Sequence, residues 1–371
     1  MKIDRLELFH LRLPLVRPFE TSFGRVSEKE TILIRVESGG IPGWGEAPVA
    51  AAPGYSYETV QTAWHIIKDF LAPRLKDIEI ARAGPIAEFF GFVRGHPMAK
   101  AGIEMAILDL FARREGRPLS QLLGGRVEEI PTGISLGIES RIEDLLGQVE
   151  QAAARGYRRI KIKIKPRWDV DVMAAVRKRF ASIPLMVDAN AAYSLADTDH
   201  LRRLDEFGLM MIEQPLDHDD LLDHAKLQAL LKTPVCLDES VKSYADARRA
   251  IEVKACRVIN IKQARVGGPF AAKALHDVCL AKGMPVWCGG LLETGVGRAH
   301  NIALATLPGF TLPGDISASE RYWKEDIIDP PVTVGPNGMI AVPTGPGLGY
   351  TVVESRVRQR TLRRETLLGA P

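Results

Sequence analysis

The hydrophobic pattern changes near residue 130 and divides the chain into two parts. In residues 1–50 the segments IDRLELFHLRL and ETILIRVES alternate apolar and polar positions, which predicts strands, and SGGIPGWGEAP supplies turn residues. Strands followed by helices are typical of a separate α+β unit. Three later segments have apolar positions three and four residues apart and are predicted to be helices: 57–75, 84–93 and 99–116.

From residue 130 onwards, short apolar runs alternate with amphipathic stretches such as IEDLLGQVEQAAARG. This alternation predicts parallel strands joined by helices, and eight such units close a barrel. We therefore predict an α/β fold: a modified (β/α)8 barrel of residues 127–316, with an α+β N-terminal capping domain of residues 1–126 that the tail, 317–371, completes. The predicted strands are 132–138, 159–165, 184–190, 209–215, 234–240, 257–262, 285–290 and 311–316.

A charged residue ends each of five consecutive predicted strands. The steps between them are 25, 25, 25 and 24 residues, a period that fits one strand, one helix and two loops. Strands two and six of eight lie opposite each other, so an amine is predicted on each side of the barrel mouth with three carboxylates between. In chain order the five residues are Lys163, Asp188, Glu213, Asp238 and Lys262.

The three carboxylates predict a metal site. Two unit charges about 4 Å apart repel by roughly 4 kcal/mol at an effective dielectric constant of 20, so clustering of Asp188, Glu213 and Asp238 would force protonation or demand a cation. A small set of oxygen ligands favours Mg²⁺, for which Mn²⁺ or another divalent cation can substitute. The alternative is that each carboxylate pairs with a helix lysine.

The segment KIKIKP predicts lysines inside the barrel. Its period of two places Lys161, Lys163 and Lys165 on one face and the isoleucines, which should face the helices, on the other. Packing Lys161 beside Lys163 in a partly dry cavity is expected to lower the pKa of the amine, so that a lysine can act as a general base. Lys165 is expected at the mouth or in solvent, without a role. The alternative, an exposed edge strand, does not suit a closed barrel.

A metal site between two opposed amines suits removal of a proton next to a carboxylate. A bound cation would stabilise the doubly charged enediolate, and one lysine would take the proton. The opposite lysine would return a proton to the other face, or stabilise the intermediate while a leaving group departs. The predicted partner is therefore a small-molecule carboxylate substrate.

Composition limits the remaining functions. The 371 residues carry a formal net charge of +3 without a run of like charges, so no nucleic-acid surface is expected. No window approaches the roughly 20 apolar residues that span a membrane, and the start of the chain lacks a signal-peptide pattern, which favours a cytoplasmic protein. Four cysteines in apolar patterns are expected to be buried and reduced: Cys236, Cys256, Cys279 and Cys288.

With these residues the chain resembles the enolase superfamily and its muconate-lactonizing-enzyme-like branch. Longer strings, among them PVWCGGLLETGVGRAHNIALATLP, FTLPGDISAS and DIIDPP, resemble the o-succinylbenzoate synthase / N-acylamino acid racemase family. The resemblance implies an enolase-type barrel, Mg²⁺ on the three carboxylates, Lys163 and Lys262 as acid/base residues, and a homo-oligomer. It implies dehydration to o-succinylbenzoate in menaquinone biosynthesis, racemisation of N-succinyl or other N-acylamino acids, or both.

Two departures from this family pattern affect loops. The family commonly has Pro-Gly after the sixth-strand lysine, where this chain has Gln263 and Ala264. It often has Pro-Gly before the tryptophan that follows the second strand, where this chain has Pro166 and Arg167. Neither change removes a catalytic group, but glycine can hold a backbone angle that arginine or alanine resists.

Three further residues are predicted to support the metal ligands and the lysines. Asn190 should point into the cavity two residues beyond Asp188, with a turn-forming asparagine as the alternative. Glu239 follows Asp238 at the strand end and is assigned to the shell around the metal. Arg265 is expected to tune the pKa of Lys262 by its positive charge or to lie on a helix surface.

The substrate contacts are predicted at the barrel rim and in two lid loops. Ser135 and the 289–295 loop, with Gly290 and Glu293, are expected to hold the distal carboxylate of the substrate. Loops 20–25 and 50–58 of the N-terminal unit are expected to act as lid contacts, with flexible surface loops as the alternative.

Rival functions remain. A dipeptide epimerase or a cycloisomerase would use the same chemistry. A barrel metallohydrolase would usually bind its metal through histidine side chains, and none of the eight histidines ends a predicted barrel strand. A non-catalytic barrel protein is the last alternative. Exchange of a substrate α-proton with deuterated solvent separates an enolising enzyme from the last two.

Overall fold

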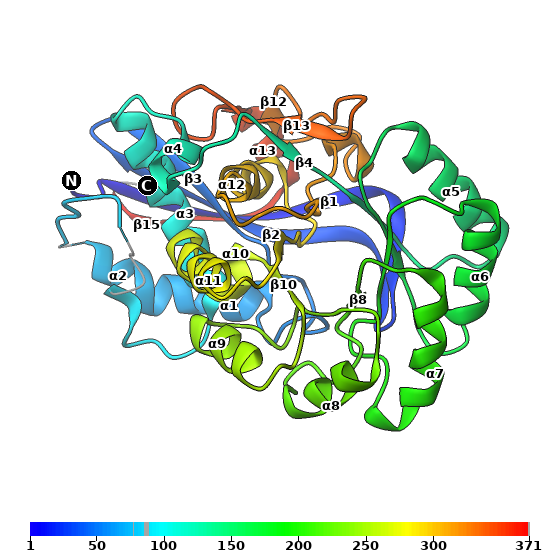
Figure 1. The fold of residues 1–371 in the computed structure, drawn as a ribbon. Coiled ribbons are helices and arrows are strands. Elements are labelled where there is room, and N and C mark those ends of the chain that lie inside the picture. Colours follow the sequence, from blue (N-terminus) through cyan, green and yellow to red (C-terminus); the bar gives the residue numbers. More distant parts are fainter. Residues whose placement is uncertain (77, 85–88, 370–371) are drawn as a thin grey trace.

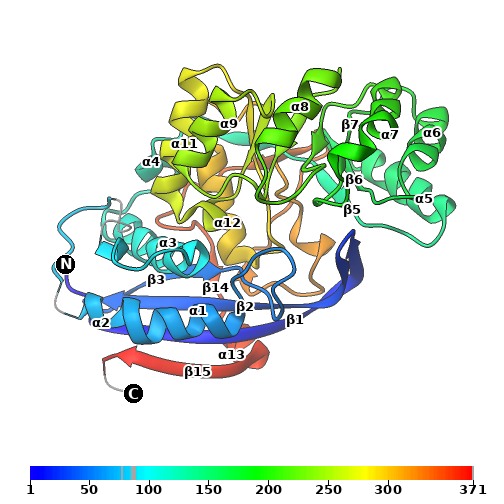
Figure 2. The ribbon, with the colours of Figure 1, turned by 90° about the horizontal axis from the view of Figure 1, so that it is seen from below.

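The computed structural model describes residues 1–76, 78–84 and 89–369. Its N-terminal part is an antiparallel sheet of order β15-β1-β2-β3, which Figure 2 shows as a layer beneath the barrel. The predicted strands of residues 1–50 are confirmed. The elements before the barrel are β1 (Arg5–Thr21), β2 (Gly24–Ser38), β3 (Ile41–Ala47), α1 (Val60–Ile66), the π-helical turn η1 (Ile67–Leu71), α2 (Ala72–Leu75), α3 (Pro97–Arg114) and α4 (Leu119–Leu123).

Helix α3 lies directly on β3 because two glycines leave room for it. A Cβ on Gly43 would come within 2.2 Å of the Ala106 carbonyl oxygen, and one on Gly45 within 2.2 Å of the Gly102 carbonyl oxygen. The prediction that SGGIPGWGEAP supplies turn residues is confirmed for Gly39 and Gly40 and wrong for Ile41–Ala47, which form β3. Gly43 and Gly45 adopt the extended backbone of a strand, and their lack of a side chain lets the helix pack closely against it.

The second part is a parallel sheet of seven strands in chain order, curled into most of a barrel (Figure 1). Each strand is hydrogen-bonded to the next, and the register sets Lys163 beside Asp188 and Asp188 beside Glu213. Seven of the eight predicted strands are thus confirmed. They are β5 (Ile134–Leu136), β6 (Ile160–Lys163), β7 (Leu185–Asp188), β8 (Ile212–Glu213), β9 (Val235–Leu237), β10 (Val258–Ile261) and β11 (Val286–Cys288).

The eighth predicted strand, 311–316, is not a strand. Phe310 makes an isolated bridge to Val286 of β11, and Gly314 makes one to Thr132 just before β5. The Asp315 N–H also donates to the Cys288 carbonyl at 2.8 Å. The segment closes the barrel without a regular ladder, because the proline in its LPGD sequence has no N–H to donate.

Helices cover the outside of the barrel, and apolar side chains fill its interior. A small cluster of Met186, Met211, Cys236, Val258 and Trp287 is buried between the strands. All four cysteines are free and buried, as predicted. The helices of the barrel part are α5 (Ile142–Ala154), α6 (Val170–Arg179), η3 (Leu195–Asp197), α7 (Thr198–Arg202), η4 (Arg203–Phe207), α8 (Leu222–Leu230), α9 (Tyr244–Glu252), α10 (Gln263–Val266), α11 (Pro269–Ala281) and α12 (Gly295–Ala305).

The tail runs back to the N-terminal sheet. Its last strand pairs with β1 in antiparallel register, from Leu6–Leu368 to Leu11–Thr361. The domain boundaries at 126 and 316 stay a prediction, and the predicted helix 84–93 lies partly outside the described residues. None of the helices in the described ranges is long and apolar enough to cross a bilayer. The remaining elements are β4 (Glu129–Pro131), η5 (Ser319–Arg321), β12 (Ile328–Asp329), β13 (Met339–Ala341), β14 (Thr351–Val352), α13 (Glu354–Arg360) and β15 (Thr361–Leu368).

The close approach of β3 and α3 makes a stability prediction. Gly45→Ala would force the helix away from the sheet and is expected to lower the free energy of unfolding by about 2 kcal/mol. Gly147→Ala is the matched control, because Gly147 lies inside α5 with no heavy atom within 4 Å of an added Cβ. It is expected to stabilise the protein by roughly 0.5 kcal/mol. Urea unfolding of both variants measures the contrast; equal effects would contradict the packing argument.

Candidate active site

Lysines and carboxylates face one another at the carboxyl ends of the barrel strands. Period-two alternation turns Lys161 and Lys163 of β6 into the barrel, where their exposed fractions are 2% and 6%. The lysine that follows β10, Lys262, is buried to the same extent, at 6%. The carboxylates of Asp188, Glu213 and Asp238 are buried between them. The exposed edge strand is therefore excluded, and so is pairing of these carboxylates with helix lysines.

Lys163 is held by two residues that follow one another closely at the end of β7. Its Nζ lies 2.6 Å from Asp188 Oδ2 and 2.6 Å from Asn190 Oδ1. The Asn190 amide in turn donates to Glu239 Oε1 at 2.9 Å. Asn190 has a φ of 44°, so its backbone also makes the left-handed turn that asparagine tolerates. One residue thus links the lysine of β6 to a carboxylate beyond β9.

Lys262 lies on the other side of the carboxylates and has a partner from the N-terminal unit. Its Nζ is 2.7 Å from Asp238 Oδ2 and 3.0 Å from the hydroxyl of Tyr55. Burial alone would lower the pKa of Lys262, but Tyr55, Glu213 and Glu239 outweigh it and raise that pKa. Tyr55 lies in the predicted lid loop 50–58, but no pattern in the sequence predicted its contact with Lys262.

Lys161 is surrounded by three carboxylates. Its Nζ lies 2.9 Å from Glu213 Oε2, 3.4 Å from Asp188 Oδ2 and 2.7 Å from Asp315 Oδ2. Burial works to lower the pKa of Lys161, but Asp315, Glu213 and Asp188 together raise it well above its ordinary value. With these partners the pKa of Lys161 is raised, whereas packing beside Lys163 near a metal was predicted to lower it. The prediction placed Asp188 and Glu213 on the metal and did not foresee Asp315.

Asp315 is the charged residue that the sequence interpretation missed. It lies in the irregular segment that closes the barrel and binds Lys161, Arg159 (3.0 Å) and the Ser135 hydroxyl (2.9 Å). Burial would raise the pKa of Asp315, but Lys161 and Arg159 lower it well below its ordinary value. The signal was present, because Asp315 lies near the end of the eighth predicted strand, 311–316, as Asp188 and Glu213 lie near the ends of theirs.

The carboxylates of Asp188, Glu213 and Asp238 are suitable ligands for a divalent cation, but only Asp188 and Glu213 are placed to share one. Asp188 and Glu213 already share one cation, the Lys161 ammonium, and each carboxylate acts on the pKa of its neighbours: burial and Asp188 both raise the pKa of Glu213. Glu239 Oε2 is buried without a hydrogen-bond partner among the described residues. Asp238 instead contacts Lys262, Arg265 and Tyr55. Within the described ranges, no three acidic, cysteine or histidine side chains are gathered tightly enough to hold a metal as they stand.

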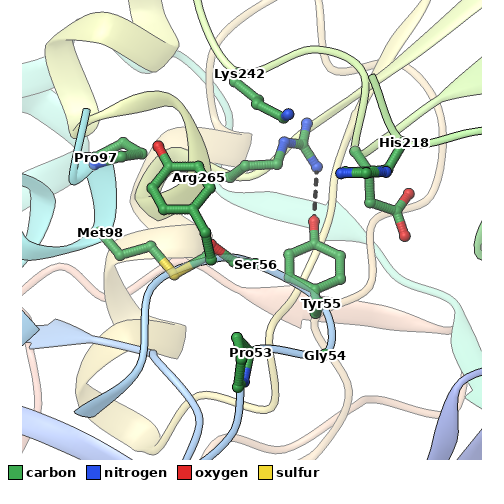
Figure 3. A pocket seen from close by; sticks show the side chains of 11 residues that line it. Pro53, Gly54, Tyr55, Ser56, Pro97, Met98, His218, Lys242 and Arg265 are labelled. Atoms are coloured by element: carbon green, nitrogen blue, oxygen red, sulfur yellow. Dashed lines mark hydrogen bonds between the residues drawn. The ribbon is translucent and has the colours of Figure 1, made fainter. Parts of the chain in front are cut away.

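Arg265 is buried at 3% exposure rather than on a helix surface. Its guanidinium pairs with Asp238, donates to the Val241 carbonyl at 2.9 Å and donates to the Tyr55 hydroxyl at 3.1 Å (Figure 3). The pKa of Lys262 is raised by Tyr55, Glu213 and Glu239, and tuning of that pKa by Arg265 stays a prediction. Arg265 therefore serves as a counter-charge to Asp238.

The predicted substrate contacts at the rim separate into two groups. Ser135 is engaged by Asp315, and Glu293 turns inward to accept from the Leu291 N–H (2.8 Å) and the Asn301 amide (3.0 Å). Glu293 therefore braces the 289–295 loop, and a carboxylate would in any case repel a carboxylate ligand. Gly290 stays at the rim, where an added Cβ would come within 2.8 Å of the Asp315 carbonyl oxygen.

Both predicted lid loops reach the barrel. In the first, Glu20 pairs with Lys165 at 3.1 Å, and the Ser22 hydroxyl donates to the Asn190 carbonyl at 3.1 Å. Lys165, for which no role was predicted, thus connects the barrel to the predicted lid loop 20–25. The second loop borders a cavity of about 240 Å³ between the N-terminal unit and the rim (Figure 3). It is lined by Pro53, Gly54, Tyr55, Ser56, Tyr57, Pro97, Met98, His218, Glu239, Lys242 and Arg265.

Comparison with known proteins identifies the family. Residues 5–124 match the family described as "Mandelate racemase / muconate lactonizing enzyme, N-terminal domain", and residues 144–356 match "Enolase C-terminal domain-like". The chain belongs to the enolase superfamily. An o-succinylbenzoate synthase of Geobacillus kaustophilus is 54% identical, over 97% of this chain and 96% of that protein. An N-succinylamino acid racemase of Amycolatopsis sp is 48% identical, over 95% and 96%.

Solved structures agree with this assignment. A member of the enolase superfamily from Listeria innocua has a TM-score of 0.95 at 42% identity, covering 99% of each chain. The predicted fold class, a modified (β/α)8 barrel of the enolase type with a capping unit, is confirmed. An L-Ala-D/L-Glu epimerase of Bacillus subtilis is more distant, at 29% identity.

The two departures from the superfamily pattern have different consequences. Arg167 has a φ of 73°, the left-handed region that favours glycine, so the side chain there is strained as expected. Ala264 lies in α10 and has no such angle. Gln263 donates to Asn301 at 2.6 Å, and its own side-chain oxygen is buried without a partner among the described residues.

The pairing of Asp315 makes a prediction with a defined pH dependence. Asp315→Asn leaves Lys161 and Arg159 without this counter-charge and is expected to destabilise the protein by about 3 kcal/mol at pH 7. Because the folded-state pKa is depressed, the wild-type advantage is present above the unfolded value of about 4 and is lost as the pH falls below it. Urea midpoints between pH 7 and pH 3 measure it. Asp199→Asn is the control, since its side chain is 98% exposed, and a pH-independent difference would contradict the argument.

Proposed function

We propose that this protein removes a proton α to a carboxylate and acts as an o-succinylbenzoate synthase, as an N-succinyl or N-acylamino acid racemase, or as both. The observation that carries the proposal is a pair of buried lysines, Lys163 and Lys262, on strands that flank three buried carboxylates. Relatives of both kinds, at 54% and 48% identity, support the same class of reaction.

The two lysines have separate tasks in this mechanism. In dehydration, Lys163 takes the α-proton and then returns it to the hydroxyl on the neighbouring carbon, which leaves as water while the released electron pair forms the double bond. In racemisation, one lysine takes the α-proton and the other delivers a proton to the opposite face. Dehydration therefore needs one competent base, whereas racemisation needs two.

The carboxylates of Asp188, Glu213 and Asp238 are the proposed ligands of a divalent cation, Mg²⁺ in the first instance. Such a cation would neutralise the second negative charge that develops on the substrate carboxylate when its α-proton leaves. These carboxylates pair with the lysines, and two of them, Asp188 and Glu213, help raise the pKa of Lys161. Engaging them elsewhere would favour the neutral amine that a base requires.

A dipeptide epimerase or a cycloisomerase is the alternative within the same chemistry, and the 29% identity to an epimerase supports it less. The acyl group and the amino-acid side chain of the substrate are open. A cytoplasmic location stays a prediction from the sequence pattern, and a homo-oligomer and a place in menaquinone biosynthesis stay predictions from the family resemblance.

Removing Lys163 tests the proposed chemistry. Lys163→Ala is expected to lower the turnover number of both dehydration and racemisation by at least about 10³-fold, because it removes the base. Both rates are measured with Mg²⁺, on the o-succinylbenzoate precursor and on a panel of N-succinyl and other N-acyl amino acids. Lys178→Ala, an exposed lysine of α6, is the matched control. Near-native turnover in Lys163→Ala would refute the mechanism.

The metal proposal can be tested by binding as well as by activity. The chelated wild-type protein is expected to bind one Mn²⁺ per chain in a paramagnetic-resonance titration and to lose activity until Mg²⁺ returns. Asp188→Asn is expected to weaken Mn²⁺ binding by at least about tenfold, because a charged ligand becomes neutral. Unchanged Mn²⁺ affinity in this variant would exclude Asp188 as a ligand.

A further inference from the structure

The two proposed acid/base lysines, Lys163 and Lys262, differ in which part of the chain supplies their uncharged hydrogen-bond partner. Each binds one carboxylate and one uncharged oxygen. For Lys163 both partners, Asp188 and Asn190, come from the end of β7 in the barrel. For Lys262 the carboxylate, Asp238, comes from the barrel, but the uncharged oxygen is the Tyr55 hydroxyl of the N-terminal unit.

The Tyr55 hydroxyl is fully used in this position. It donates to Asp238 Oδ1 at 3.0 Å and accepts from Lys262 Nζ at 3.0 Å. It also accepts from the Arg265 guanidinium at 3.1 Å, the bond that Figure 3 shows. A hydroxyl has one donor and two acceptor positions, so every one of them is occupied. The Lys262 ammonium also lies 4.4 Å from the centre of the Tyr55 ring, which adds a favourable cation–π contact.

Tyr55 lies in a loop that depends on few other contacts. The loop from residue 50 to 57 has no regular secondary structure, and its tip is exposed. Within it, the Gly54 N–H bonds only locally, to the Ala52 carbonyl. The tip also meets the first lid loop, since a Cβ on Gly54 would lie 3.2 Å from the Phe23 ring. The hydroxyl of Tyr55 is thus a polar connection between this lid and the reacting end of Lys262.

We propose that Tyr55 is a positioning residue for Lys262 and thereby a determinant of reaction specificity, favouring the two-base racemisation over the one-base dehydration. The inference rests on the proposed function. With its hydroxyl in place, the lid fixes the Lys262 amine on the face opposite Lys163. Without it, Lys262 loses the uncharged contact that holds its amine on this face, so the second face loses its proton carrier while Lys163 keeps Asn190 from the barrel.

The test compares the two reactions and the two faces in Tyr55→Phe. Loss of hydrogen bonds to charged groups is expected to lower kcat/KM for racemisation by about tenfold or more, and dehydration by less than about threefold. In deuterated solvent, exchange of the α-proton is expected to slow for one enantiomer of an N-succinyl amino acid and to stay near wild type for the other. Tyr55→Ala, which also removes the ring face, should show the same asymmetry at larger size.

A second readout does not depend on catalysis. Hydrogen exchange of the backbone amides of residues 50–57 in the metal-free protein is expected to accelerate in Tyr55→Phe, because the lid loses its polar connection. Tyr244→Phe is the matched control: the same substitution at the start of α9, outside the lid loop and the cavity, at a residue that is 49% exposed. It should show neither the enantiomer asymmetry nor faster exchange.

The outcomes separate this inference from the proposed function. If the wild-type protein catalyses neither dehydration nor racemisation, the proposed function fails. If it catalyses them but Tyr55→Phe slows both reactions and both enantiomers equally, the positioning role is overturned and the proposed function stands. A wild type that exchanges the α-proton of only one enantiomer also overturns the positioning role, since Lys262 then carries no proton.

Discussion

Charge balance in a nearly dry cavity is the constraint on which this site depends. Five cationic side chains meet five carboxylates at the barrel mouth, so their formal charges cancel without any ligand. A divalent cation would leave an excess of two positive charges, which a substrate with two carboxylates would offset. The cationic residues are Arg159, Lys161, Lys163, Lys262 and Arg265, and the carboxylates are Asp188, Glu213, Asp238, Glu239 and Asp315, all buried or nearly so.

The barrel and its ring of charges could be predicted because parallel strands repeat with a fixed period. The alternation in KIKIK identifies the inward lysines without any tertiary information, since side chains of one strand alternate between two faces. The closing segment could not be predicted in the same way. Its proline and glycine break the ladder, so its apolar residues suggested a strand that does not form, and Asp315 was left without a place in the ring.

The pKa of the buried lysines could not be predicted from the sequence, because it depends on contacts between strands. Lys161 and Lys163 are neighbours on one strand, which suggests mutual repulsion and a lowered pKa. The carboxylates that reverse this effect for Lys161 come from β7, β8 and the closing segment. A sequence shows which charges share a strand, but the sum of charges around one atom depends on the cross-barrel distances. Arg265 illustrates the same limit, because only the fold turns it toward Asp238.

Overall similarity does not decide which reaction this chain favours, since relatives named for dehydration and for racemisation are 54% and 48% identical to it. The barrel supplies carboxylates and Lys163 with partners of its own, so these groups serve either reaction. Lys262 differs because the capping unit contributes one of its partners through Tyr55. Lid loops lie on the surface and tolerate sequence change better than barrel strands. Under the proposed mechanism, a loop that holds Lys262 would therefore let the balance between the two reactions shift while the ring of paired charges stays intact.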